Sequence, residues 1–423
     1  MTTDLLRALF ATALTAADPA TCLPRVRLPQ PPKGRSVVVA IGKAACSMTR
    51  ALQARWQGPL EGIVLTRYGH ALDCPGLEVI EAAHPVPDAK GRAAAGRILQ
   101  LVEGLGVDDL LLMLISGGGS ALLSLPAQGL TLAQKQDINR QLLASGAPIH
   151  EMNVVRKHLS AVKGGRLAAA AFPAEVQTIL ISDVPGDDPA TIASGPTVGD
   201  PSTSAEALAI LARCGITPPE AVTRHLHDPA SETPKPEDPI FVRACVQIAL
   251  RPADMLEAVA AHAREAGYEV VCLGAEVEGE AREVAAVQAA QALAIARDPA
   301  SSRRGVILLS GGETTVTLRN RGGKGGRNLE YLLALALALE GEARITALAC
   351  DTDGLDGSEE NAGGLLDPLT LARARSAGID PGEALAQNQS YEVFKAAGGL
   401  ITTGPTLTNV NDIRIIKIDP LGA

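Results

Sequence analysis

Short apolar runs alternate with longer amphipathic stretches along this chain of 423 residues. In the first half, the apolar runs that predict buried strands cover residues 36–42, 62–66, 77–84, 108–116 and 176–183. Helices are expected between them, over residues 44–56, 89–105, 130–145 and 155–171. Because the strands are apolar throughout and helices separate them, the pattern is typical of a parallel sheet covered by helices on both faces.

The same alternation returns after a segment that is rich in proline and charge. That segment, residues 217–239, is interpreted as an interdomain connector or hinge, with a long surface loop as the alternative. Beyond it the pattern predicts helices over 253–267 and 281–298, and strands over 269–274, 305–311, 345–351, 399–404 and 413–418. A chain of this length is too long for one ordinary core, so two α/β domains are expected.

Composition and charge narrow the class of protein. The net charge of −9 and the pI near 5.4 argue against a nucleic-acid partner, which would require a basic face. No apolar run approaches the ~20 residues that cross a bilayer, so no membrane partner is expected. Asp4 and Arg7 interrupt the apolar N-terminal stretch, which favours an amphipathic helix over a signal peptide. Seven cysteines without a C-x-x-C pair predict free thiols and a cytoplasmic protein. A homodimer is the expected assembly.

Glycines and a lysine follow the first and fourth predicted strands. Gly42 and Lys43 stand at a strand-to-helix turn, where the first turn of the helix favours an anion. Gly117, Gly118, Gly119 and Ser120 leave backbone N–H groups open to a phosphate or carboxylate. The alternatives are a solvated lysine and glycines that only allow close strand–helix packing. His84, between an apolar run and two prolines, is a further candidate binding residue, with a structural role as the alternative.

Carboxylates and cations occupy other strand and helix ends. Asp183, Asp187 and Asp188 follow a strand, and such carboxylates suit Mg²⁺, although Asp-Pro-Gly segments are also ordinary turns. Lys163 and Arg166 fall on one face of the helix expected at 155–171, with a solvated face as the alternative.

The most informative stretch is residues 305–364. A strand ends in Ser310, Gly311, Gly312 and Glu313, a glycine loop carries Lys324 and Arg327, and the next strand ends in Asp351, Asp353 and Asp356. Fixed cations, glycine loops and clustered carboxylates are the groups that handle phosphate with a metal ion. The pattern therefore favours a phosphotransferase. The chain contains no G-x-G-x-x-G dinucleotide motif, no P-loop and no protein-kinase signature.

Several motifs together resemble the glycerate 2-kinase family, whose chains end in a MOFRL domain. These motifs are AIGKAA, HPVPD, ISGGGSALL, NVVRKHLSAVKGGRLA, ISDVPGDDPATIASGPT, LLSGGETTV, GGRNLE and ACDTDGLDG. The resemblance spans nearly the whole chain. One departure is the segment VRACVQIALRPADML, where the family usually has a more polar stretch.

The resemblance implies a fold and a division of the chain. The first domain, residues 1–238, is expected to be a Rossmann-like parallel sheet with helices on both faces. The second, residues 239–423, is expected to be a smaller α/β domain with a mixed sheet, and the active site to lie in the interdomain cleft.

The resemblance also implies phosphorylation of D-glycerate by ATP and Mg²⁺ to 2-phosphoglycerate and ADP. Lys43 and Arg327 are then expected to be essential, and Asp353 is the third expected catalytic residue. The expected metal ligands are Asp183, Asp187 and Asp351. The remaining expected contacts to nucleotide or substrate are Gly42, His84, Gly117, Gly118, Gly119, Ser120, Lys163, Ser310, Gly311, Gly312 and Glu313.

Two other functions stay open at this stage. Relatives of the family are also labelled hydroxypyruvate reductases, and such an NAD(P)H enzyme would use the same class of substrate; the missing dinucleotide motif counts against it. The other is a non-catalytic sensor of sugar acids, which would not need carboxylates clustered beside cations.

Overall fold

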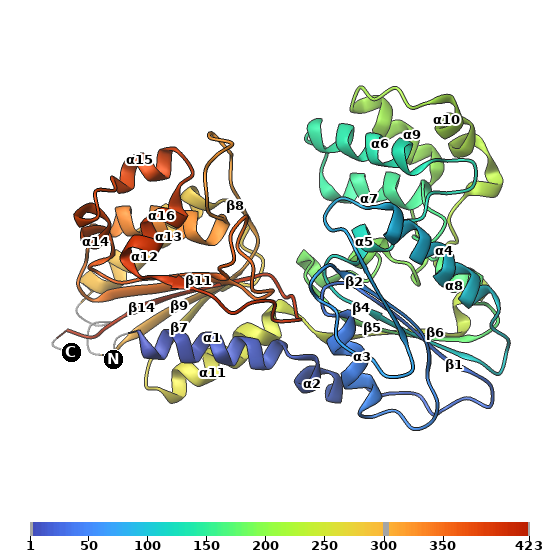
Figure 1. The fold of residues 1–423 in the computed structure, drawn as a ribbon, viewed down its shortest axis with the longest axis horizontal. Helices are drawn as coiled ribbons and strands as arrows, with labels where there is room; N and C mark the ends of the chain where they lie inside the picture. Colours follow the sequence, from blue (N-terminus) through green and yellow to red (C-terminus); the bar gives the residue numbers. More distant parts are fainter. Residues whose placement is uncertain (1–2, 299–303, 422–423) are drawn as a thin grey trace. The chain divides into compact units, whose positions relative to one another are not determined.

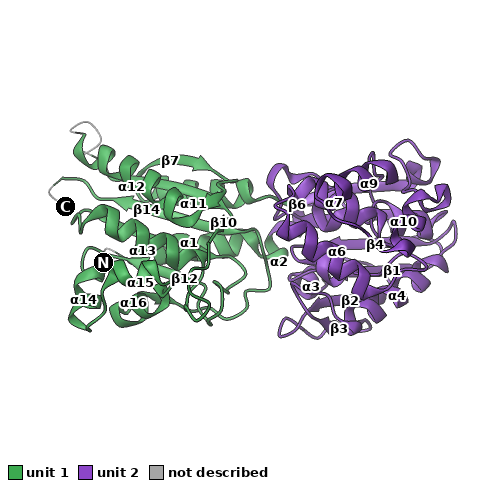
Figure 2. Cartoon of the chain, turned by 90° about the horizontal axis from the view of Figure 1, so that it is seen from above, with its two compact units in different colours: residues 1–21, 250–423 green, residues 22–249 purple. Residues whose placement is uncertain are grey.

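The computed structural model describes residues 3–298 and 304–421, and these form two compact units. One unit combines residues 1–21 with residues 250–423, and the other contains residues 22–249 (Figure 2). This division differs from the expected boundary between residues 238 and 239. Among the described residues no helix has both the length and the apolar character needed to span a membrane.

The unit of residues 22–249 is built on a six-stranded sheet in the order β3-β2-β1-β4-β5-β6. The pairs from β3 to β5 are all parallel. The chain builds outward from β1 to β3 and then crosses to the other side of β1 at β4, so the order reverses between β1 and β4. At such a switch point, open α/β sheets bind ligands. The strands are β1 (Ser36–Ile41), β2 (Glu61–Arg67), β3 (Glu78–Ala82), β4 (Leu110–Ile115), β5 (Glu175–Ile181) and β6 (Ala244–Leu250).

Helices cover both faces of this sheet, as the strand pattern predicted (Figure 1). α4 (Ala89–Glu103) and α8 (Arg166–Ala171) pack on the face that carries Val37 and Val39. The opposite face, with the buried Val38, packs against α3 (Ala45–Gln53). A separate apolar cluster holds together α6 (Leu132–Ala144), α7 (Ile149–His158), α9 (Ser204–Arg213) and α10 (Glu220–His227).

The prediction of a single helix over residues 155–171 is wrong. α7 ends at His158 and α8 begins at Arg166. Between them the chain turns at Gly164 and Gly165, whose φ angles of +56° and +78° are incompatible with a right-handed helix. Because the chain turns here, α7 and α8 pack on different neighbouring helices.

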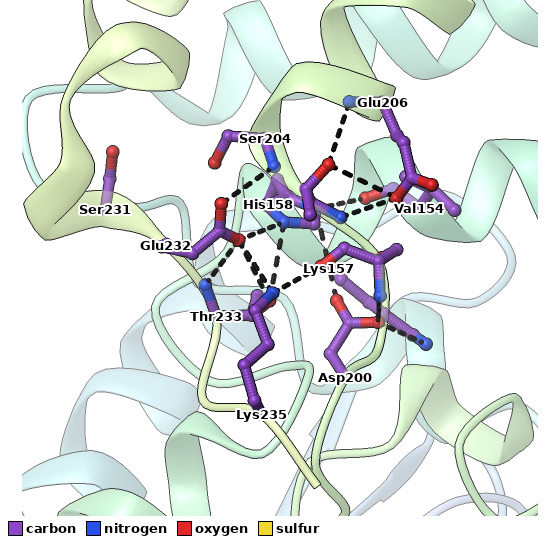
Figure 3. A network of polar contacts seen from close by, with 12 residues as sticks. Val154, Lys157, His158, Asp200, Ser204, Glu206, Ser231, Glu232, Thr233 and Lys235 are labelled. Atoms are coloured by element: carbon purple, nitrogen blue, oxygen red, sulfur yellow. Dashed lines mark hydrogen bonds and ion pairs between the residues drawn. The ribbon is translucent and has the colours of Figure 1, made fainter. Parts of the chain in front are cut away.

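The hinge interpretation of residues 217–239 is also wrong, because polar contacts fix this segment within its unit (Figure 3). Oε1 of Glu232 lies 2.8 Å from Nε2 of His158 on α7, and Oε2 accepts a hydrogen bond from the backbone of Ser204 on α9. Burial opposes the ionised form of Glu232, but hydrogen bonds from Ser204, Lys235 and His158 outweigh it and lower the pKa. The unit ends at Ala249, ten residues after this segment. That position lies within β6, the strand formed by the segment that departs from the family pattern.

The other unit contains a second six-stranded sheet in the order β13-β12-β11-β14-β9-β7. Only the β7–β9 pair is parallel, and the other pairs are antiparallel, which confirms the expected mixed sheet. The strands are β7 (Glu269–Gly274), β9 (Val306–Gly312), β11 (Ile345–Asp351), β12 (Gly363–Leu366), β13 (Leu400–Ile401) and β14 (Asp412–Ile418). β8 (Gly279–Glu280) and β10 (Thr314–Thr315) form a small separate pair. The sequence pattern did not predict β12.

Helices also cover this second sheet. The N-terminal helix α1 (Asp4–Ala17) packs on α11 (Pro252–Glu265), with Oγ1 of Thr12 2.6 Å from Nδ1 of His262. Leu6 and Leu9 of α1 are fully buried, which explains why the first residues belong with a unit more than 200 residues later in the chain. The remaining helices are α12 (Ala281–Arg297), α13 (Arg327–Leu339), α14 (Thr370–Ser376), α15 (Pro381–Ala386) and α16 (Ser390–Ala397).

Candidate active site

In the unit of residues 22–249, two loops meet at the switch point of the sheet. The backbone N–H of Lys43, after β1, donates to the carbonyl of Gly117, after β4, at 2.8 Å. Oγ of Ser116 accepts from the N–H of Ala44 at 3.0 Å, so α3 begins tied to the neighbouring loop. The structure therefore brings together Gly42, Lys43 and the glycine loop, as the strand ends predicted.

His84 lies against this pair of loops. A Cβ on Gly118 would be 3.1 Å from the His84 ring and 3.5 Å from Cγ of Lys43. Gly118 also has a φ of +83°, which side chains of L-residues rarely adopt. The three residues come from three different strand ends, and only glycine at position 118 lets them approach so closely.

Lys163 is buried with 1% exposure and holds the next part of the loop. Its Nζ donates to the carbonyl and hydroxyl oxygens of Ser120 at 2.9 and 2.8 Å, and to the carbonyl of Ala193 at 3.2 Å. Ala193 and Ser194 both have positive φ angles, 51° and 62°, which is strained for residues with a Cβ. Since all three protons of Lys163 are used on protein oxygens, this lysine positions the loop.

The carboxylates after β5 have different surroundings. Asp188 is engaged in its own turn, where it accepts from Thr191 Oγ1 at 2.8 Å. Asp183 and Asp187 are half-buried near the carboxyl end of β5. Asp351, the third expected metal ligand, belongs to the other unit. The described residues contain no group of three His, Cys, Asp or Glu side chains arranged to hold a metal ion.

In the unit that contains residues 250–423, Arg327 lies among three carboxylates. Its Nε is 2.8 Å from Asp412 Oδ2, Nη2 is 2.6 Å from Asp351 Oδ2, and Nη1 is 3.1 Å from Glu313 Oε1. Asp412 and Asp351 are buried, whereas the Glu313 side chain is 56% exposed. Burial opposes the charge of Arg327, but Asp412, Asp351 and Glu313 outweigh it and raise the pKa.

These three carboxylates converge because their strands are adjacent. In the antiparallel register, Asp412 at the start of β14 lies opposite Asp351 at the end of β11 and opposite Gly312 at the end of β9. Glu313 follows Gly312 directly. Sequence reasoning found Arg327, Asp351 and Glu313 but missed Asp412. The only signal for it was the NVND segment in front of the last apolar run.

Asp356 caps α13 from a distant loop. Its Oδ1 accepts from the N–H of Asn328 and its Oδ2 from the N–H of Leu329, both at 2.9 Å. Burial raises the pKa of Asp356 to about 6, even though these hydrogen bonds favour the ionised form. The start of α13 is thus already occupied by a carboxylate. Asp353 is also buried, and its Oδ1 accepts from the N–H of Leu355 at 2.9 Å.

Ser310, Gly311 and Gly312 differ from the glycine loop after β4, although the motifs look alike. They lie within the buried strand β9. The fully buried Arg414, another residue that sequence reasoning missed, donates to the carbonyls of Gly311 and Gly312 at 3.3 and 3.0 Å. A Cβ on Gly312 would be 2.3 Å from the backbone of Val277. These contacts favour a packing role for this second Ser-Gly-Gly motif.

Comparison with known proteins links both units to one family. Residues 5–227 match the family described as Domain of unknown function (DUF4147), and residues 306–412 match the MOFRL family. A glycerate 2-kinase of Pyrococcus horikoshii is 40% identical over 392 residues, which cover 90% of this chain and 87% of that protein. A protein of Agrobacterium vitis, provisionally named hydroxypyruvate reductase, is 51% identical over 417 residues, covering 98% and 94%. The crystal structure of glycerate kinase from Thermotoga maritima has a TM-score of 0.88 at 37% identity and covers 99% of both chains.

Proposed function

Because the chain belongs to the glycerate 2-kinase family, we propose that it transfers the terminal phosphoryl group of ATP to the C2 hydroxyl of D-glycerate. The products are ADP and 2-phosphoglycerate. The observation that carries this proposal within the structure is the contact between Lys43 and the glycine loop at the switch point. This backbone contact supports a role for the Lys43 side chain beside the N–H groups of the glycine loop, where a small anion is favoured.

Phosphoryl transfer depends on positioning and on charge neutralisation more than on covalent chemistry. Lys43 supplies positive charge to a phosphate or carboxylate oxygen, and Gly117–Ser120 supply the backbone donors. Lys163 keeps this loop in place through its hydrogen bonds to Ser120 and Ala193. His84 lies against the same loop at Gly118.

Arg327 requires one further step to act on a substrate anion. All three of its nitrogen atoms already lie beside carboxylates. Glu313 is the exchangeable partner, because it is the exposed one of the three and exposed ion pairs contribute little to stability. When Glu313 moves away, Nη1 of Arg327 becomes available while Asp351 and Asp412 keep the guanidinium in position.

Mg²⁺ fits the carboxylates after β5. Asp183 and Asp187 offer hard oxygen donors on a loop at the carboxyl edge of the sheet, and Mg²⁺ takes one or two carboxylates together with waters and phosphate oxygens. Asp351 fits less well, since Arg327 already occupies its Oδ2. When bound, the ion would neutralise charge on the transferred phosphate. Asp353 is the carboxylate that we assign to the proton of the glycerate hydroxyl.

The cysteines support a reducing, cytoplasmic environment for this reaction. All seven are free thiols, and four of them, Cys22, Cys46, Cys74 and Cys350, are buried.

The test is an assay of purified protein with D-glycerate, ATP and Mg²⁺, which follows ADP release. We expect ADP formation that depends on glycerate and stops with EDTA. The ³¹P spectrum of the product identifies the position, because a phosphate on C2 couples to one proton and a phosphate on C3 to two. NADH or NADPH consumption with hydroxypyruvate, without ADP formation, would contradict the kinase.

A variant pair connects this activity to the switch point. Lys43→Met removes the cation and should reduce turnover by about 10³-fold, the lower end of the range for losing a transition-state cation. Lys33→Met removes an exposed lysine shortly before β1 and should leave turnover unchanged.

A further inference from the structure

Three cations lie close together in the unit of residues 22–249, and none of them is paired with a described carboxylate. Lys135 is on α6, Arg156 is on α7, and Lys163 follows α7. Burial is the main cause of a lowered pKa at each, and the charge of Arg156 contributes at both lysines. Two other cations on these helices do have carboxylate partners. Arg140 on α6 pairs with Asp137, and Lys157 on α7 pairs with Asp200.

Lys135 is the least satisfied of the three. Its Nζ is shielded from solvent and has no hydrogen-bond partner among residues 3–298 and 304–421. Burial, and then the charge of Arg156, lower the pKa of Lys135 to about 7. A buried ammonium without a partner is destabilising, so proteins normally pair or neutralise such a group.

Arg156 has only neutral partners. Its Nε donates to Oδ1 of Asn139 at 2.7 Å and its Nη1 to Oδ1 of Asn153 at 3.3 Å. Asn139 and Lys135 are one helical turn apart and therefore share a side of α6. The hydrogen bond to Asn139 holds the Arg156 guanidinium on that side. These bonds orient the guanidinium without neutralising its charge.

Lys163 connects the two cations to the glycine loop. Its three hydrogen bonds end on Ser120 and Ala193, and the Ser120 hydroxyl lies 3.1 Å from that of Ser194. Three basic side chains without a carboxylate partner in the described structure therefore lie near the loop that follows β4. An anion of one or two charges is the group that would balance them.

We propose that Lys135 and Arg156 bind an anionic group of the substrates, with Lys163 holding the adjacent loop. The group is either the carboxylate of glycerate or the phosphates of ATP, and both offer the same anionic oxygens. The identity of the anion as a kinase substrate rests on the proposed function. The anion site itself follows from the three unpaired cations.

The first test uses sulfate as a probe, which does not require turnover. Urea unfolding of the full-length protein is measured in sodium sulfate and in sodium chloride of equal ionic strength. Sulfate raises the midpoint of folded proteins in general, because it is excluded from their surface. We expect the rise to be larger in the wild type than in Lys135→Met, and the difference measures binding at the site. Arg140→Met removes an exposed charge from the same helix and should keep the whole rise. A Lys135→Met protein with the full sulfate effect would overturn the proposal.

The second test identifies the anion by calorimetric titration with D-glycerate and with ATP, each alone. Lys135→Met and Arg156→Met should both weaken the binding of the same one of these ligands by tenfold or more. Loss of glycerate affinity assigns the site to the carboxylate, and loss of ATP affinity assigns it to the phosphates. Unchanged affinity for both ligands would contradict a substrate role. An absence of glycerate-dependent ADP formation in the wild type would instead refute the kinase and leave the sulfate result standing.

The stability of Lys135→Met tests separately whether Lys135 has only a structural role. Because Lys135 has no partner in the described structure, Lys135→Met in chloride should unfold at the same or a higher urea concentration than the wild type. A lower midpoint would show that Lys135 stabilises the fold through a contact of its own and would refute the proposal.

Discussion

Nε of Arg327 lies 2.8 Å from Oδ2 of Asp412, a carboxylate whose side chain has no exposure to solvent. Asp412 also accepts hydrogen bonds from Asn328 Nδ2 at 2.9 Å and from Arg414 at 3.2 Å. One buried aspartate at the start of the last strand thus connects the start of α13 with the buried arginine that holds the end of β9. The position of Arg327 depends on this contact.

Asp412→Asn should lower both stability and turnover. The amide places an NH₂ group where one of these donors now meets an oxygen, and leaves Arg327 with one buried anion fewer. We expect a loss of about 1–3 kcal/mol in the free energy of unfolding. Urea unfolding measures it, with the exposed Glu265→Gln on α11 as a control that should change neither property. Wild-type stability in Asp412→Asn would mean that this contact does not hold Arg327.

Arg327→Lys separates the catalytic role of the arginine from its structural role. Lysine retains the charge that Asp351 and Asp412 need, but it cannot contact several oxygens through a planar group. Turnover should fall by about 10³-fold or more, while the fold persists. Arg327→Ala should in addition cost about 3–5 kcal/mol, because it removes the cation that two buried carboxylates share. Steady-state rates and urea unfolding of the two variants distinguish these effects. Near wild-type turnover in Arg327→Lys would remove Arg327 from the reaction.

Gly118→Ala should impair the glycine loop in two ways. The φ of +83° costs about 1–2 kcal/mol for a residue with a Cβ, and the new methyl group presses on the His84 ring. Gly129→Ala is a matched control, since Gly129 has a φ of +84° and no atom near its Cβ position. Gly118→Ala should lose at least as much stability as Gly129→Ala, and only Gly118→Ala should raise the KM for ATP or glycerate. Equal kinetics in the two variants would indicate that the loop does not contact substrate.

Because burial raises the pKa of Asp356, we expect the stability of the protein to depend on pH. Its folded pKa is about 6 and its ordinary value is 3.8, so the folded state binds a proton more tightly than the unfolded state. The group stabilises the fold below pH 3.8, and this contribution is lost as the pH rises through 6. The difference in unfolding free energy between Asp356→Asn and the wild type should therefore move in favour of the variant from about pH 4 to pH 6 and then remain constant. A difference that is constant across this range would show that Asp356 stays ionised.

Local pattern determined much of this protein. The strands β1, β2, β4, β5, β9, β11 and β14 follow from apolar runs, because a strand buried on both faces requires such a run. The placement of Lys43, His84 and the glycine loop at one edge follows as well, since parallel strands bring their carboxyl ends together. Gly118 is an example. Its motif is visible in the sequence after a predicted strand, and in the structure it lies next to His84, which follows another strand.

Only the tertiary structure decided which distant residues meet. The pairing of Asp412 with Arg327 depends on the order and register of β9, β14 and β11, and no local pattern encodes which strands become neighbours. The N-terminal helix joined the later unit because its buried leucines pack beside α11, and an amphipathic helix alone does not specify its partner. No pattern in the sequence singled out Lys135. Its burial beside Arg156 results from the packing of α6 on α7, because burial and the surrounding charges are properties of the assembled fold.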